Sequence, residues 1–303
     1  MTFFSRSLTR RFFGVLLAAT AALSVASTAT AQGRDATPSG FTGKVFVNEG
    51  GGVRIHTYMA DPKGAMVTTH IIEGKRGLIM VDAQFVADSA KEVRRYVDGL
   101  GKPVERLYIS HEHPDHWFGL HHFGHMPVHA GPLTAKFLTE RAAQVIAQRK
   151  ADSSPPQVGG VVTEGSHVVA GVTLNIRMIR DAEAAEELVI EVPAVGALIV
   201  QDFVYNNVHA VVSRNLDNWL EALSGLEKQA HAKTIVLAGH GEPTTPAAFG
   251  EMKAYLNTVK PLLLANIGKP EQADAIVKEV SEKFPNRRMA PLLKLGLSRA
   301  LPN

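Results

Sequence analysis

Residues 110–119, S-H-E-H-P-D-H-W-F-G, place three histidines and an aspartate within six residues. In an extended chain, side chains two residues apart point to the same side, so His111 and His113 can direct both imidazoles to one point. Pro114 suits the first turn of a helix, from which Asp115 and His116 would project. Imidazole and carboxylate groups are ligands of Zn²⁺, Fe and Mn²⁺. The spacing therefore predicts a metal site, and the alternative is a surface loop with fortuitous histidines.

The surrounding sequence predicts the elements that must hold this segment in place. Short β-rich runs fill residues 43–82, a helix is expected over 86–100, and the strand V-E-R-L-Y-I-S leads directly into the histidine segment. A second helix is expected over 132–150. The second half repeats this order, with strands near 167–179, 187–192, 196–201 and 234–238 and helices near 216–230, 246–265, 270–283 and after residue 285. Strand-rich halves that are each followed by helices predict two packed sheets with helices outside.

The first 31 residues are typical of an export signal. A basic start precedes a short apolar run and the small residues A-T-A at 29–31. The apolar run, about thirteen residues, is shorter than the roughly 20 that span a bilayer, so an uncleaved anchor is the less favoured alternative. Arg10 and Arg11 resemble the twin-arginine signal, and a plain Sec signal is the alternative. We expect cleavage near Ala31–Gln32 and a periplasmic or secreted bacterial protein without a stable membrane anchor. The signal would engage the twin-arginine or Sec machinery.

The mature chain is expected to have a flexible leader over residues 32–42 and a single domain over 43–303. Its charge is balanced, because the signal holds three of the 32 Lys and Arg residues and none of the 29 acidic residues. The remaining 29 basic residues form no cluster, so no nucleic-acid partner is expected. The chain has no cysteine, so an exported form cannot depend on disulfides for stability.

The histidine segment, placed after a strand and before a helix, resembles that of the metallo-β-lactamase fold superfamily. G-L-I-M-V-D-A (77–83), Q-D-F-V (201–204) and A-G-H-G-E-P (238–243) resemble further motifs of that superfamily in the same order. The resemblance implies an α/β fold, a four-layer αββα sandwich of two mixed β-sheets with helices on both outer faces. It also implies that Asp82 supports the metal loop, that Asp202 bridges two metals, and that His240 binds the second one. The alternatives are a turn carboxylate for Asp202 and a loop histidine for His240.

The chain departs from the superfamily pattern at one position. The superfamily usually supplies a further histidine before the strand that corresponds to L-V-I-E-V-P (188–193), whereas this chain reads A-E-A-A-E-E there. Counting back from Leu188 places Glu183 where the histidine belongs, and Glu186 or Glu187 could serve instead. Alkylsulfatases of the superfamily are similar in carrying a glutamate there, but they are much longer. An acidic helix face without any ligand is the remaining alternative.

The resemblance implies two divalent metal ions, zinc in the first place, with Mn²⁺ or Fe as alternatives. His111, His113 and Glu183 would hold the first ion, and Asp202 would bridge the two. The second ion would bind Asp115, His116 and His240. The extra carboxylate charge should raise the pKa of bound water above the value near 7 of a good zinc site. Asp115 would orient the hydroxide and move its proton.

The predicted function is an exported metal-dependent hydrolase that attacks a small-molecule ester, lactone or sulfate ester. A β-lactam-hydrolysing role is disfavoured, because the chain has no cysteine ligand and lacks the third histidine of the all-histidine subclass. The alternatives are a periplasmic metal-binding accessory protein without strong activity and a mononuclear iron oxygenase on the same fold.

Some further side chains could contact substrate or simply pack. Trp117 and Phe118 follow the ligands directly, and they would form a wall of the pocket or belong to the core. His209, a few residues beyond Asp202, could reach the mouth of the metal site. The remaining histidines are expected to pack, to face solvent or to be incidental: His56, His70, His121, His122, His125, His129, His167 and His231.

Overall fold

The computed structural model describes residues 1–2, 33–124, 126 and 128–302. The predicted signal peptide lies almost entirely outside these residues. Among the helices that they form, none is both long and apolar enough to span a bilayer.

The chain forms two β-sheets. The first has the strand order β1-β2-β3-β4-β5-β6-β7-β8, antiparallel as far as β5 and parallel from β5 to β8. Its strands are β1 (Arg34–Asp35), β2 (Lys44–Gly50), β3 (Val53–Met59), β4 (Thr68–Glu73), β5 (Leu78–Val81), β6 (Val104–Ile109), β7 (Val128–Ala130) and β8 (Val158–Val161). The second has the order β13-β12-β11-β10-β9 and is antiparallel except for the pair β12 and β13. Its strands are β9 (Gly165–Val169), β10 (Val172–Arg180), β11 (Glu186–Val192), β12 (Ala197–Tyr205) and β13 (Ile235–His240).

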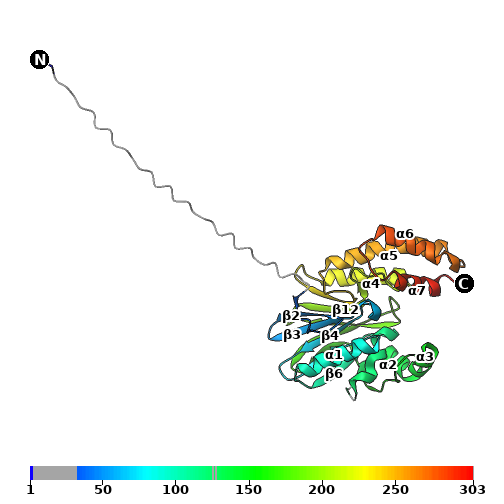
Figure 1. The fold of residues 1–303 in the computed structure, drawn as a ribbon, viewed down its shortest axis with the longest axis horizontal. Coiled ribbons are helices and arrows are strands. Elements are labelled where there is room, and N and C mark those ends of the chain that lie inside the picture. The colour runs from blue at the N-terminus through cyan, green and yellow to red at the C-terminus, as the bar shows by residue number, and fades with distance from the viewer. Residues whose placement is uncertain (3–32, 125, 127, 303) are drawn as a thin grey trace.

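Helices cover the outer faces of both sheets (Figure 1). The α-helices are α1 (Ala87–Gly99), α2 (Pro132–Glu140), α3 (Ala142–Arg149), α4 (Leu216–Gln229), α5 (Ala247–Ala265), α6 (Ala273–Lys283) and α7 (Ala290–Ala300). The short 3₁₀ helices are η1 (Pro62–Gly64), η2 (Pro114–His116), η3 (Phe118–Phe123) and η4 (Pro270–Gln272). The helices α1 to α3 lie on the side of the first sheet, and α4 to α7 lie on the side of the second.

Strand alternation explains this layering. Leu78 and Met80 of β5 enter the core beneath α1, whereas Ile79 and Val81 enter the core between the sheets. In the second sheet, Ile190 of β11 faces the inter-sheet core. Because successive side chains point to opposite faces, strands that are buried on both sides read as continuous apolar runs. Three apolar cores separate four layers, which confirms the predicted αββα sandwich.

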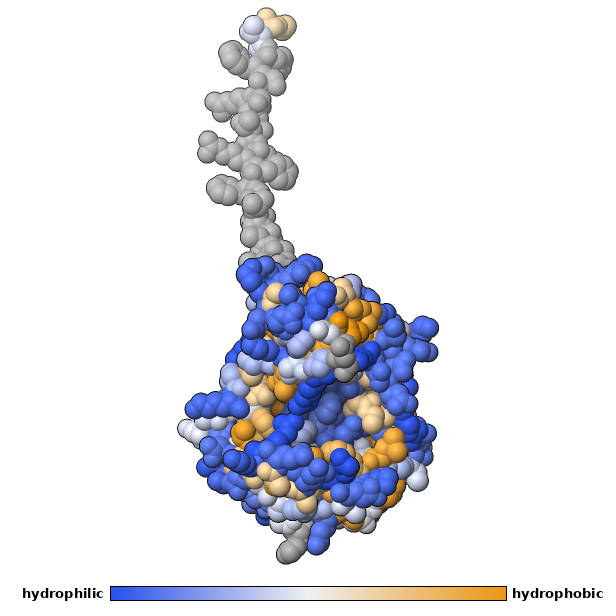
Figure 2. Space-filling model, turned by 90° about the vertical axis from the view of Figure 1, so that its right-hand side faces the viewer, coloured by the Kyte–Doolittle hydropathy of each residue, from blue (hydrophilic) through white to orange (hydrophobic). Residues whose placement is uncertain are grey.

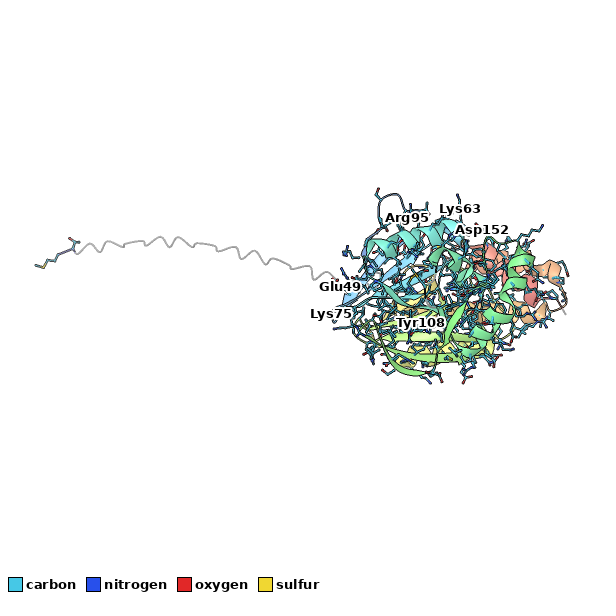
Figure 3. The ribbon with its side chains drawn as sticks, turned by 90° about the horizontal axis from the view of Figure 1, so that it is seen from below. Glu49, Lys63, Lys75, Arg95, Tyr108 and Asp152 are labelled. Carbon is cyan, nitrogen blue, oxygen red and sulfur yellow. The ribbon has the colours of Figure 1, made fainter. Side chains whose placement is uncertain are left out.

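The strand ends define two opposite ends of the molecule. The β2–β3 and β4–β5 turns, marked by Glu49 and Lys75, lie close together at one end (Figure 3). Tyr108 of β6 is buried in the core between the sheets. Strands β5, β6, β12 and β13 all end at the other end of the sandwich. The predicted metal-binding residues follow β6 or lie in the last residues of β12 and β13, except for Glu183, which lies in the turn between β10 and β11.

Three expectations about elements differ from the structure. The leader is not free over its described part, because Arg34 and Asp35 pair with β2 and Thr42 hydrogen-bonds to Glu92. The helix expected over 132–150 is two helices, α2 and α3, separated at Arg141. The strand expected over 167–179 is a hairpin of β9 and β10, whose turn contains Gly171 with a φ of 78°.

Candidate metal centre

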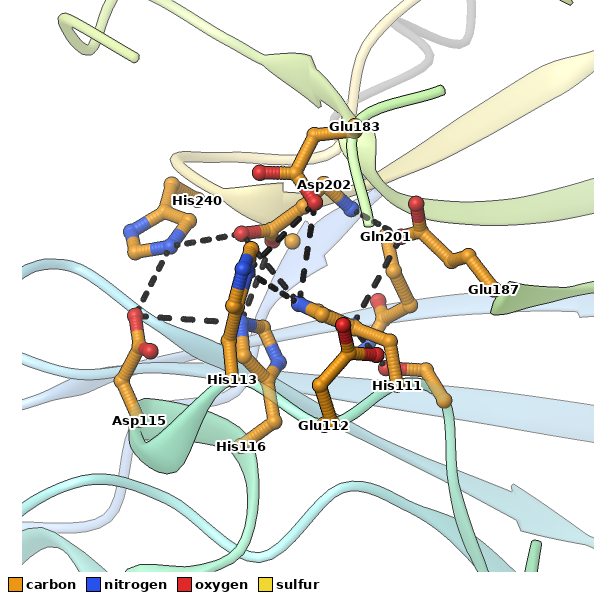
Figure 4. A network of polar contacts seen from close by, with 12 residues as sticks. His111, Glu112, His113, Asp115, His116, Glu183, Glu187, Gln201, Asp202 and His240 are labelled. Atoms are coloured by element: carbon orange, nitrogen blue, oxygen red, sulfur yellow. Dashed lines mark hydrogen bonds and ion pairs between the residues drawn. The ribbon is translucent and has the colours of Figure 1, made fainter. Parts of the chain in front are cut away.

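All seven residues predicted as metal ligands meet in one place. Ligand atoms of His111, His113, Glu183 and Asp202 lie within 4.8 Å of one another, and a second group with the same limit consists of Asp115, His116, Asp202 and His240. Asp202 belongs to both groups. We refer to these seven residues as the ligand cluster (Figure 4).

The first group combines the strand-to-helix segment with the turn between β10 and β11. His111 Nε2 lies 3.0 Å from His113 Nδ1, which shows that the two imidazoles converge as the His-x-His spacing predicts. Glu183 Oε2 lies 3.4 Å from His113 Nδ1 and 3.9 Å from His111 Nε2. Glu183 therefore lies beside both histidines of the first group.

The second group forms around η2 and the last residue of β13. His116 Nε2 lies 3.2 Å from Asp202 Oδ1, and His240 Nε2 lies 3.4 Å from Asp202 Oδ2. Asp115 Oδ2 lies 3.4 Å from His240 Nε2. A Cβ atom at residue 239 would collide with Asp202 Oδ1, so the first glycine of G-H-G leaves room for the shared carboxylate.

The two alternatives to Glu183 have other partners. Glu186 is buried, forms an ion pair with Arg180 and accepts a hydrogen bond from the backbone of Leu133 at the start of α2. Glu187 is also buried, and its Oε1 accepts a hydrogen bond of 2.7 Å from the backbone N–H of Asp202. Neither glutamate belongs to the ligand cluster, but Glu187 contacts the backbone of one of its members, Asp202.

Polar groups around the cluster orient the imidazoles. His116 Nδ1 is 2.7 Å from Asp82 Oδ2, His240 Nδ1 is 2.8 Å from the carbonyl of Ala65, and His111 Nδ1 is 2.8 Å from Ser110 Oγ. Each contact leaves Nε2 of the same ring directed into the cluster. A metal-binding histidine commonly makes such a hydrogen bond with its other nitrogen.

Asp82 holds the histidine segment, as the resemblance implied. It accepts hydrogen bonds of 2.7 Å from both the backbone N–H and the hydroxyl of Ser110. Gln201 also donates to Asp82 and contacts His70 Nε2 at 2.9 Å. His70, expected to be incidental, thus belongs to the buried network beneath the site. Asp82 has a φ of 65° and Gln201 a φ of 40°. The backbone is therefore strained after β5 and within β12, where the two strands approach the cluster.

The charges of the cluster are strongly coupled. Burial alone would lower the pKa of His240, but Asp202 and Asp115 raise it to about 9. Burial would raise the pKa of Asp202, but His116 and His240 hold it well below its ordinary value. Burial raises the pKa of Glu183 well above its ordinary range, and the charges of Asp202 and Glu187 raise it further.

The cluster fits divalent cations. Within the part of the chain that the structure describes, four buried atoms of the cluster make no hydrogen bond: His116 Nε2, Glu183 Oε2, Asp202 Oδ1 and His240 Nε2. Buried polar atoms normally have a partner, and these four belong to residue types that bind Zn²⁺, Mn²⁺ or Fe. Three carboxylates packed so closely need positive charge to remain ionised together.

A small cavity of about 60 Å³ opens onto the cluster. His113, Asp115, Asp202 and Tyr205 line one side of it. The sequence analysis did not identify Tyr205, whose hydroxyl donates a hydrogen bond of 2.6 Å to Asp202 Oδ2 and whose ring stacks on His240. Its position three residues beyond Asp202 on the same strand was the only signal.

The residues predicted to contact substrate lie elsewhere. Trp117 is fully buried in the core beneath α1, and its Nε1 donates to the carbonyl of Glu112. Phe118 belongs to the same core. His209 is buried beside Tyr255 Oη and Ser281 Oγ, where burial lowers its pKa to about 4. The structure therefore does not bring Trp117 or His209 to the cavity, because apolar packing and helix contacts hold both side chains away from it.

The remaining histidines are also apart from the cluster. His56 is buried between Tyr96 and Glu73, and the rings of His121 and His122 lie 3.8 Å apart within η3. His125 lies outside the described residues. His129 is on β7, His167 bonds to the carbonyl of Thr163, and His231 precedes β13.

Comparisons with known proteins agree with this geometry. A model of the metallo-beta-lactamase superfamily matches residues 63–240. A search of curated proteins found no match. Among solved structures, a metallo-beta-lactamase from Pontibacter korlensis is similar with 20% identity and a TM-score of 0.56, over 70% of this chain and 99% of that one. A beta-lactamase domain protein from Burkholderia ambifaria has 22% identity and a TM-score of 0.58, over 85% and 86%.

A stereoselective inverting sec-alkylsulfatase from Pseudomonas sp. has 16% identity and a TM-score of 0.59, over 81% of this chain and 49% of that one. At these identities the solved structures support the fold alone. The family match, in contrast, covers more than half of the chain and includes every segment that contributes to the ligand cluster. The chain therefore belongs to the metallo-beta-lactamase superfamily.

Proposed function

We propose that this protein is an exported metal-dependent hydrolase of small molecules. The observation that supports this proposal most strongly is the ligand cluster, in which buried and partly buried side chains of suitable type converge from the β6–η2 segment, the β10–β11 turn and the ends of β12 and β13. His111, His113 and Glu183 would hold one cation, and Asp115, His116 and His240 would hold the other. Asp202 would contact both.

When bound, divalent cations in such a site lower the pKa of water and polarise the group under attack. The chain itself supplies the proton transfer. Burial alone would raise the pKa of Asp115, but His116 and His240 hold it well below its ordinary value. Asp115 is therefore a carboxylate at neutral pH, and its partly exposed side chain faces the cavity. We assign it the role of orienting the attacking water and accepting one of its protons.

The reaction consumes one water per bond. A hydroxyl from water adds to the carbonyl or sulfuryl centre, the ester bond breaks, and the leaving oxygen takes up a proton, which gives an acid and an alcohol. During the reaction, Tyr205 keeps Asp202 in place through the hydrogen bond that its hydroxyl donates to the Asp202 carboxylate. Esters, lactones and sulfate esters are the substrates that this chemistry accepts.

Metal content and turnover test the proposal together. The protein should be prepared metal-free, reloaded with Zn²⁺, Mn²⁺ or Fe²⁺, and assayed on chromogenic esters, lactones and sulfate esters. We expect two cations per chain and metal-dependent turnover. One cation without turnover would favour a metal-binding accessory protein, and one iron with oxygen uptake would favour an oxygenase.

The proposal of export depends on residues 1–31 and has its own test. The protein expressed in a bacterium with its complete signal should accumulate in the periplasm or medium with Gln32 as its first residue. Replacing Arg10 and Arg11 by lysine should block export through the twin-arginine route. Continued export of this variant would indicate the Sec route, and retention of the intact signal would contradict the proposed cleavage.

A further inference from the structure

The cavity over the ligand cluster contains two arginines that no catalytic role requires. Arg149 is the last residue of α3 and Arg299 lies near the end of α7, and both line the cavity together with His113, Asp115 and Asp202. The face on which these two helices lie is hollowed near its centre, with hydrophilic side chains between apolar rims (Figure 2). Two helices from opposite outer layers of the sandwich thus contribute positively charged side chains to one opening.

Arg149 and Arg299 line the same cavity, and among the described residues neither has a dedicated counter-ion. Neither forms an ion pair with any of the residues that the structure describes. Partial burial lowers the pKa of Arg299, and the positive charge of Arg149 lowers it further. The negative charge of Asp115 raises the pKa of Arg299. Asp115 also forms closer contacts with the imidazoles of His116 and His240, at 3.8 Å and 3.4 Å. Two like charges at one opening repel each other, although both side chains are exposed to solvent, and an anion between them would remove this repulsion.

The rest of the cavity wall is apolar. Phe85, Val211, Leu292 and Leu295 line it between the arginines and the ligand cluster. The volume of about 60 Å³ is far below the roughly 300–1,000 Å³ of a pocket that encloses a drug-sized ligand. The cavity can therefore enclose only the reacting end of a substrate, and any charged group held by the arginines must be close to the bond that breaks.

We propose that the substrate of this hydrolase carries an oxyanion, a carboxylate or a sulfate, that Arg149 and Arg299 bind while the adjoining bond faces the ligand cluster. This proposal rests on the proposed hydrolase function. Guanidinium groups suit such anions because their planar N–H donors pair with two oxygens at once. Arg299 lies beyond residue 240, where the family match ends, so its contribution to this selection comes from the C-terminal helices of this chain.

Three substrates with the same p-nitrophenol leaving group test the proposal. These are the neutral acetate ester, the singly charged monosuccinate ester and the sulfate ester. The double variant Arg149→Gln/Arg299→Gln should lose roughly tenfold in kcat/KM per guanidinium on the preferred anionic substrate. Its kcat/KM on the neutral ester should change by less than about twofold. Arg141→Gln is the matched control, because Arg141 is an exposed arginine next to α3 that does not line the cavity.

The outcomes separate the two levels of the proposal. Preference for the monosuccinate identifies a carboxylate, and preference for the sulfate ester identifies a sulfate. An equal loss on charged and neutral esters, or a wild-type preference for the neutral ester, would overturn the role of the arginines and leave the hydrolase intact. If no substrate is turned over, calorimetric titration of the metal-loaded proteins with inorganic sulfate tests the anion site directly. Sulfate binding that is weaker in the double variant than in wild type and Arg141→Gln supports the site. Equal sulfate binding by wild type and the double variant overturns it.

Discussion

At the level of a single residue, the proposed ligand Glu183 would change the charge of the metal centre. A neutral histidine at this position would leave two carboxylates in the ligand cluster, whereas Glu183 makes three with Asp115 and Asp202. Glu187 adds a fourth acidic side chain, which is buried and accepts a hydrogen bond from the backbone of Asp202. Each further negative charge binds a cation more strongly but reduces its power to acidify water. As a ligand, the glutamate would therefore favour hard cations and a weaker Lewis acid than a zinc site with three histidine ligands.

Replacing Glu183 by glutamine tests its role as a ligand. The amide keeps the shape of the side chain but removes its charge, so the variant should retain one cation per chain in place of two and should lose most of its turnover. Metal analysis after gel filtration and the kcat of a chromogenic ester measure both effects. Glu186→Gln is the control, because Glu186 is equally buried but pairs with Arg180 outside the cluster. Equal metal content in wild type and Glu183→Gln would contradict the assignment.

Tyr205 offers a second test at this scale. Its hydroxyl holds the carboxylate shared by both halves of the cluster, and such supporting hydrogen bonds are worth about 10–100-fold in metal affinity or activity. Tyr205→Phe should therefore weaken metal binding by this factor, measured by competition with a chromogenic chelator, while the fold is kept. Tyr255→Phe is the matched control, since Tyr255 is also buried but contacts His209. A loss of stability with unchanged metal affinity would assign Tyr205 a purely structural role.

Local spacing explains which site residues the sequence could predict. The His-x-His-x-Asp-His segment and the order of the Asp202 and His240 motifs predict the cluster because each depends on a strand end or a tight turn. Glu183 followed from its distance to the next strand. Tyr205, Arg149 and Arg299 could not be predicted in the same way, because their roles arise only when separate elements meet. Trp117 and His209 were misplaced because proximity in sequence does not show which face of an element is buried.

At the scale of elements, α7 positions part of the cavity. Leu292, Leu295 and Arg299 of this helix line the cavity, and Gly296 packs directly against the backbone of Val212. A Cβ atom at Gly296 would collide with the N–H and carbonyl of Val212, so the helix can approach this closely only with glycine there. The position of Arg299 thus depends on a contact one turn away.

Gly296→Ala should push α7 outward. Alanine normally stabilises a helix interior by up to about 1 kcal/mol relative to glycine. Here we expect a loss of about 1–3 kcal/mol, because overpacking against backbone outweighs the propensity gain. Denaturant unfolding measures the change. Gly225→Ala in α4 is the control with the opposite sign, because nothing lies within 4 Å of its added Cβ. A stabilised Gly296→Ala variant would show that the α7 contact is loose.

The predicted elements were accurate wherever local pattern and burial agree. Apolar runs flanked by turn residues predicted most strands, and the expected helices over 86–100, 216–230, 246–265 and 270–283 correspond to α1, α4, α5 and α6. The helix break at Arg141 and the hairpin at Gly171 were missed because helical and strand periodicity continue across both positions. The pairing of Arg34–Asp35 with β2 was missed because it is made by backbone N–H and C=O groups. Every residue other than proline carries both groups, so the side chains give no signal of the pairing.

The stability of the whole molecule depends on charges at both ends of the sandwich. At the end opposite the ligand cluster, the buried carboxylate of Glu73 accepts contacts from Lys102 at 2.7 Å, Arg54 at 2.8 Å and His56 at 3.0 Å. These partners come from β3 and from the loop before β6, so Glu73 connects neighbouring parts of the first sheet. Burial alone would raise the pKa of Glu73, but these three contacts lower it to about 2.

This shift fixes the sign of a pH effect. The folded-state pKa of about 2 is below the ordinary value of 4.5, so folding favours the charged form. The stabilisation is complete above pH 4.5 and is lost as the pH falls towards 2. At pH 7, Glu73→Gln should lower the free energy of unfolding by on the order of 2 kcal/mol, because screening of the partly exposed cations reduces the full value of the shift.

The deficit of Glu73→Gln should shrink steadily between pH 4.5 and 2, since wild-type Glu73 becomes protonated in both states. Denaturant unfolding of metal-free wild type and variant across this range measures the difference without interference from the loss of cations in acid. Glu279→Gln is the control, because Glu279 forms only an exposed ion pair with Lys283 and should contribute less than about 1 kcal/mol at any pH. A deficit that stays constant down to pH 2 would mean that Glu73 stabilises the sheet by packing and hydrogen bonding, independently of its charge.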